Sequence, residues 1–187
     1  GSFSVAQANW SQSFDESLDQ LRPSAQKYIK DLEAEDRSKV RIYKLPIWVW
    51  TRLSAERSKS SGLHLIDTKK SKATIEVDHV ISWKLWESNY PVESDVHSVG
   101  NHIGNCSLLE KTFNISKGSD TLDVWLSKIE NFPSDSWKQA FSIPIEMSSP
   151  NFQMAGSGQA LSRLIELRTN EIKDALIRYI SESGKSF

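Results

Sequence analysis

The sequence predicts an α+β fold that is mostly α-helical, with a short β-hairpin and a following helix set among other helices. Apolar residues recur at helical spacing over 159–182, which indicates a long amphipathic helix. Two β-prone pieces, 73–77 and 106–109, predict the strands of the hairpin. The second piece runs directly into residues 111–117, which resemble a short helix ended by Gly118.

The length of 187 residues suits one sizeable domain, or one core with an appended lobe. We expect an N-terminal helical segment at 1–38 and a main domain at 39–187. Gly1 and Ser2 resemble a cloning remnant, and the chain has no initiator Met. The sequence is therefore expected to be a fragment of a longer protein.

The N-terminal half predicts helices first and β-prone pieces later. Apolar spacing favours helices at 4–21 and 25–32, whereas 40–57 is ambiguous. Val40 and Ile42 alternate as in a strand, but Pro46 can open a helix, and we favour a helix from about 46 to 58. Residues 63–67 form another short β-prone piece.

The C-terminal half predicts irregular structure and then helices. The chain is expected to be irregular over 91–100, helical around 122–129 and helical again from Ser134. A loop rich in Ser, Pro and Gly is expected at 147–158. The buried face of the last helix is expected to comprise Leu161, Leu164, Ile165, Arg168, Ile172, Leu176, Tyr179 and Ile180.

Charge and cysteine content limit the classes of function. The net charge of −1 gives no overall basic surplus for nucleic acid, so a local patch matters more. Lys69, Lys70 and Lys72 form one such patch, either as a phosphate contact or as a solvated loop. The single cysteine, Cys106, excludes an internal disulfide and a Cys-based zinc site and fits a reduced, intracellular setting. No stretch reaches the roughly 20 apolar residues of a membrane span.

One ordered set of polar residues carries the chemistry. A β-run ends in Asp78-His79, a long loop follows, Asn105 precedes the second apolar run, and Asn114 lies nine residues after Asn105. Hydrolysis of a phosphodiester needs a base that activates water, a cation that neutralises charge, and geometry that aligns them. The residues of this set can supply the base and the ligands that hold such a cation.

The residue types suggest a role for each position. His79 suits the base, because its ordinary pKa of about 6.5 leaves much of it neutral near pH 7. Asp78 and Asn114 offer hard oxygen ligands for one Mg²⁺ or Mn²⁺ ion. The loop around Asn105 can orient the His79 ring through a side-chain or main-chain oxygen. On a regular strand Asp78 and His79 would face opposite sides, so the strand is expected to bend or end there.

Three further residues are weaker candidates. His102 can approach the metal or the DNA, although a solvent-exposed loop histidine is the simpler interpretation. Glu76 alternates with Asp78 and is therefore a candidate outer group of the same site. His64, on a β-prone piece, is interpreted as structural.

The stretch from Ile75 to Lys117 resembles the HNH (ββα-metal) nucleases, in the variant whose last His is replaced by Asn. Residues 103–111 with Asn114 resemble the C-terminal HNH domain of GmrSD-type modification-dependent restriction enzymes, as does the final helix with Arg168 and Thr169. The likeness spans roughly 40–182 and is sharp over 75–118.

The resemblance implies a ββα-metal core and roles for individual residues. His79 would be the general base, Asp78 and Asn114 the metal ligands, and Asn105 the residue that positions His79; Lys117 would lie near the phosphate. It further implies a bacterial, cytoplasmic enzyme that attacks duplex DNA, including modified phage DNA. Its partner would be an upstream nucleotide-hydrolysing domain of the same protein.

The sequence departs from the GmrSD-type pattern at two positions. Asp78 replaces the usual Glu of Glu-His, and Ser82 stands where a Pro is usual. These departures concern the subfamily more than the chemistry. Two alternatives stay open: an HNH-fold module that binds nucleic acid without cleavage, and a bacterial toxin nuclease of the colicin kind.

Overall fold

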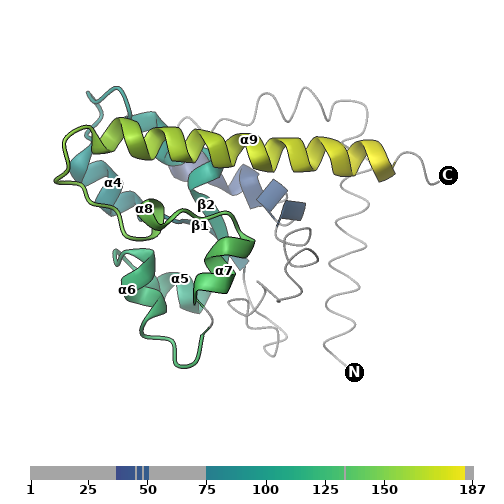
Figure 1. Cartoon of the computed structure of the whole chain (residues 1–187), viewed down its shortest axis with the longest axis horizontal. Helices are drawn as coiled ribbons and strands as arrows, with labels where there is room; N and C mark the ends of the chain where they lie inside the picture. The colour runs from purple at the N-terminus through teal and green to yellow at the C-terminus, as the bar shows by residue number, and fades with distance from the viewer. Residues whose placement is uncertain (1–36, 45, 48, 51–74, 133, 184–187) are drawn as a thin grey trace.

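The computed structural model describes residues 37–44, 46, 47, 49, 50, 75–132 and 134–183, and within them a two-stranded sheet is surrounded by helices. The fold class is thus α+β and mostly helical, as the sequence predicts. The elements are η1 (Arg37–Tyr43), β1 (Ile75–His79), α4 (Trp83–Asn89), η3 (His97–Asn101), η4 (Ile103–Asn105), β2 (Cys106–Glu110), α5 (Lys111–Lys117), α6 (Leu122–Leu126), α7 (Ser134–Ala140), α8 (Ile145–Ser148) and α9 (Ser157–Ser183). Figure 1 shows α9 along one side of the strands and α5, α6 and α7 on the other.

The two strands pair antiparallel with a fixed register. Val77 lies opposite Leu108, and His79, the last residue of β1, lies opposite Cys106, the first of β2. Leu108 and Cys106 are buried. This register places the end of β1, with its polar residues, beside the start of β2.

Helix α5 follows β2 without a linker and contacts both strands. It ends as predicted at Gly118, whose φ of 54° lies in the left-handed region that glycine adopts without steric cost. The strand, loop, strand and helix therefore occur in the order that the sequence predicts.

Helix α9 holds the start of β2 in place. Arg168, 2% exposed, donates to the main-chain oxygens of Gly104 (2.5 Å), Cys106 (3.0 Å) and Phe141 (3.1 Å). Thr169 Oγ1 accepts from the Gly104 amide at 3.0 Å. A buried guanidinium without such acceptors would be strongly destabilising, so these bonds fix α9 against η4.

The segment between the strands is more ordered than predicted. We expected a long loop that is irregular over 91–100, but the chain forms α4, η3 and η4 there. Trp86 explains the difference, because its side chain is fully buried and its Nε1 donates to His97 O at 3.0 Å. Burial of this large aromatic side chain anchors α4 against η3.

The strand-like alternation of Val40 and Ile42 is misleading. Residues 37–43 form the 3₁₀ helix η1, and helical residues continue at 44, 46, 47, 49 and 50. Val40 and Tyr43 are both buried, and a spacing of three residues places them on one face of a 3₁₀ helix. The boundary expected between residues 38 and 39 falls inside η1.

The C-terminal helices largely follow the sequence. Helices α6, α7 and α9 occur where helical spacing or capping residues predict them, whereas α8 forms within the expected loop at 147–158 and just before it. Residues Leu161, Ile165, Arg168, Ile172 and Leu176 of the predicted face are buried. In the described part of the chain, no helix has the length and apolar character needed to cross a bilayer.

Several predictions fall on residues outside those described. They are the two N-terminal helices, the β-prone piece at 63–67, His64, and the patch of Lys69, Lys70 and Lys72.

Candidate functional site

A pocket of about 800 Å³ lies between η1, β1, α4 and α5. Asp78, His79 and Asn114 all line it, so the structure brings three of the predicted site residues together. The full lining is Arg37, Val40, Arg41, Lys44, Glu76, Val77, Asp78, His79, Ser82, Trp83, Lys84, Asn114, Ile115, Gly118 and Ser119.

Asp78 and His79 reach the same pocket because β1 ends at His79. Consecutive residues of a regular strand face opposite sides, whereas the chain turns away after His79. The strand end that the sequence requires at this point is present. Glu76 lies two residues earlier and therefore shares the side of Asp78.

The His79 ring is held by Asn101, a residue that the sequence analysis missed. His79 Nε2 lies 3.2 Å from Asn101 Oδ1, and both side chains are buried. Because the amide oxygen is an acceptor, the ring donates from Nε2 and keeps the lone pair on Nδ1. Asn101 belongs to η3, 22 residues after His79, so no local pattern points to it.

Burial lowers the pKa of His79 to about 4. The positive charges of Lys117 and Arg37 act in the same direction, while the hydrogen bond with Asn101 opposes them. His79 is thus neutral at pH 7. A neutral imidazole has the lone pair that a general base needs.

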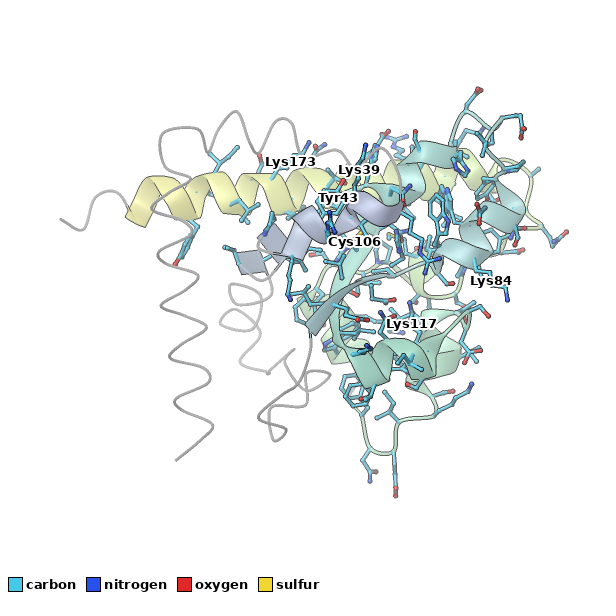
Figure 2. The ribbon with its side chains drawn as sticks, turned by 180° about the vertical axis from the view of Figure 1, so that it is seen from behind. Lys39, Tyr43, Lys84, Cys106, Lys117 and Lys173 are labelled. Atoms are coloured by element: carbon cyan, nitrogen blue, oxygen red, sulfur yellow. The ribbon has the colours of Figure 1, made fainter. Side chains whose placement is uncertain are left out.

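Lys117, which the resemblance implies lies near the phosphate, is buried beside Asp78 and His79. It is 1% exposed and forms an ion pair with Asp78, with 2.7 Å between Nζ and Oδ2. The same Nζ donates to the main-chain oxygen of His79. Figure 2 shows Lys117 between α5 and the strands, where its charge is compensated by the Asp78 carboxylate.

The position of Lys117 on α5 explains why its side chain is buried. Lys117 lies three residues after Asn114 on a helix that packs against β1, so its side chain is directed at the strand. Burial raises the pKa of Asp78, and the adjacent Lys117 acts in the opposite direction. A buried carboxylate of this kind requires a cation beside it.

Asn114 connects to Glu76 across the pocket. Its Nδ2 donates to Glu76 Oε2 at 3.0 Å. This contact orients the Asn114 amide. Within the described residues no cluster of three or more His, Cys, Asp or Glu side chains is arranged to hold a metal ion. Any oxygen site here would combine the carboxylates with the Asn114 amide.

Asn105 is structural in this fold. Its Nδ2 donates to Gly100 O (2.9 Å) and Ile81 O (3.2 Å), and its Oδ1 accepts from the Ile81 amide (2.9 Å). Its main-chain oxygen accepts from Val80 N at 2.7 Å. The prediction that Asn105 positions the His79 ring is therefore corrected: Asn105 secures the turn after His79, and Asn101 holds the ring.

Among the described residues, four basic side chains line the pocket. Arg37, Arg41 and Lys44 come from η1 and the residue after it. Lys84 comes from α4 and is labelled in Figure 2. We call these four the basic rim. His102 is not among the lining residues, and its main-chain oxygen accepts from Cys106 Sγ at 3.5 Å.

Comparison of the chain with protein-family models, curated proteins and solved structures finds no match. Roles for these residues therefore rest on their geometry and chemistry.

Proposed function

We propose that the protein is a metal-dependent endonuclease of the HNH (ββα-metal) type that hydrolyses phosphodiester bonds of DNA. The observation that carries the proposal is the convergence of Asp78, a neutral His79 and Asn114 on one pocket with a basic rim. The order β1, β2, α5 and the contacts of α5 with both strands support a ββα core.

The donor set fits one Mg²⁺ or Mn²⁺ ion. Asp78, Asn114 and the neighbouring Glu76 present carboxylate and amide oxygens, which hard divalent cations prefer. When bound, such an ion would stabilise negative charge on the phosphate and on the departing oxygen. Asp78 is the principal ligand in this proposal, and Glu76 orients Asn114.

His79 supplies the proton acceptor. With Nε2 donating to Asn101, Nδ1 takes a proton from water, whose oxygen then bonds to phosphorus as the bond to the departing oxygen breaks. The negative phosphate of the substrate would raise the low pKa of the ring once it is bound, which makes the ring a better base. Asn101 acts through His79 and is a positioning residue.

The biological setting is part of the proposal. A nuclease of this type would act in the bacterial cytoplasm as the effector of a restriction or defence system. Its substrate would be duplex DNA, including modified phage DNA, and an upstream nucleotide-hydrolysing domain would control it.

Plasmid nicking tests the proposal. We expect wild type to convert supercoiled plasmid to open circles with Mg²⁺ or Mn²⁺ and not with EDTA, and His79→Ala to lose at least about a hundredfold in rate. His97→Ala is the matched control, because His97 Nδ1 bonds Tyr90 O and the side chain does not line the pocket. If neither the wild-type chain nor the full-length protein nicks plasmid with any divalent metal, the claim that the protein is an enzyme is refuted.

One observation favours a second function, DNA binding without cleavage. The Lys117 ammonium already neutralises Asp78, the carboxylate that the catalytic proposal assigns to the metal. Salt-dependent DNA binding with no metal-dependent nicking would select this alternative.

A further inference from the structure

The basic rim has a charge surplus at the mouth of the pocket. Apart from Lys44, the rim sets three cationic side chains beside two carboxylates, Glu76 and Asp78, and Lys117 already pairs with Asp78. Arg37, Arg41 and Lys84 are exposed, and none of the described carboxylates forms an ion pair with them. The chain as a whole has a net charge of −1, so this positive patch is local.

The spacing of the rim suits a line of phosphates. Arg37 and Arg41 lie four residues apart on η1, which at about 2 Å per residue is about 8 Å along the helix. One DNA strand carries a phosphate charge about every 3.4 Å of helix axis. The distance between Arg37 and Arg41 is therefore roughly two intervals between phosphates. Lys84 reaches the pocket from a different element, α4, next to Trp83, whose ring lies 5.8 Å from the His79 ring.

One residue of the rim, Arg37, also interacts electrostatically with the candidate base His79. The charge of Arg37 contributes to the lowered pKa of His79, and at Asp78 it opposes the larger effect of burial, which raises that pKa. A strand held by Arg37 would thus pass close to these two residues.

We propose that Arg37, Arg41 and Lys84 bind the sugar-phosphate backbone of one DNA strand and hold it across the pocket that contains His79. This inference rests on the proposed function and names the residues that bind its substrate. The contacts are with phosphates, so they give affinity and register without base specificity.

Salt-dependent binding to a labelled DNA duplex, measured by fluorescence anisotropy in EDTA, tests the rim without requiring cleavage. Arg37→Gln and Arg41→Gln are each expected to weaken binding and to reduce the slope of log K against log salt by about 0.9, the value for one lost phosphate contact. Arg163→Gln removes the same charge from an exposed position on α9 outside the pocket lining, and it is expected to bind as wild type.

The outcomes separate the rim from the nuclease. The proposed phosphate contacts are wrong if both rim variants bind DNA with the wild-type affinity and salt slope, or if Arg163→Gln loses as much affinity as they do. This holds even when wild type nicks plasmid. If the rim variants show a smaller salt slope but wild type nicks no plasmid with any divalent metal, the rim binds DNA and the proposed nuclease activity is wrong.

Discussion

Replacement of Lys117 by Met tests whether the buried ion pair with Asp78 is a central element of the site. Methionine keeps the unbranched apolar stem of lysine but removes the ammonium, which lies 2.7 Å from Asp78 Oδ2 at 1% exposure. The Asp78 carboxylate, 9% exposed, would then be buried without its partner. Removal of one partner of a buried pair costs about 3–5 kcal/mol.

The predicted loss is large enough to measure. For a chain of this size each kcal/mol lowers the midpoint of thermal unfolding by about 2–4 °C, so a decrease of roughly 6–20 °C is expected. The assay is thermal and urea unfolding of wild type, Lys117→Met and the double variant Asp78→Asn/Lys117→Met, all in EDTA. The double variant removes both charges and should recover much of the stability lost by Lys117→Met.

The stability lost in Lys117→Met is expected to depend on pH. Without Lys117, burial raises the pKa of Asp78 further above its unfolded value. A folded-state pKa above the unfolded value adds stability at low pH that disappears as the pH rises through the folded-state pKa. The deficit of Lys117→Met should therefore shrink on acidification. A deficit under 1 kcal/mol at pH 7, or one that does not change with pH, would refute this reasoning.

Three further perturbations test other parts of the structure. Because the pKa of His79 is lowered to about 4, the free energy of unfolding should fall by up to about 3 kcal/mol between pH 6.5 and 4 in wild type relative to His79→Gln, as urea unfolding measures; equal pH profiles would contradict this. Asn101→Ala should slow nicking about 10–100-fold and shift the His79 transition to lower pH, whereas an effect on stability alone would indicate a structural role. Gly104→Ala should cost several kcal/mol in thermal unfolding, since its Cβ would lie 1.9 Å from Ile165 O, whereas Gly156→Ala meets no atom within 4 Å and should cost only its backbone strain of about 1 kcal/mol; similar losses would contradict the close packing.

Local sequence patterns predicted the elements that carry the site. Alternation and β-propensity located β1 and β2, and Gly118 marked the end of α5. Helical spacing located α9 because a long amphipathic helix repeats its signal many times. The convergence of Asp78 and Asn114 was predicted from their order along the chain, and both line the pocket.

Contacts between distant segments were not predictable in the same way. Asn101 was missed because nothing near it in the sequence links it to His79, and Asn105 was chosen in its place. Lys117 was assigned to the phosphate because its burial depends on how α5 packs on β1. Arg37 and Arg41 were overlooked because η1 is remote in sequence from β1 and joins the pocket only in the folded chain.

The most direct test of the central claim is metal-dependent nicking of supercoiled plasmid by wild type and by His79→Ala, with the fold of both checked by thermal unfolding. The proposal predicts open circles with wild type in Mg²⁺ or Mn²⁺, none in EDTA, and a rate at least about a hundredfold lower for His79→Ala. Equal nicking by folded wild type and folded His79→Ala would contradict it, because the proton acceptor would then lie elsewhere.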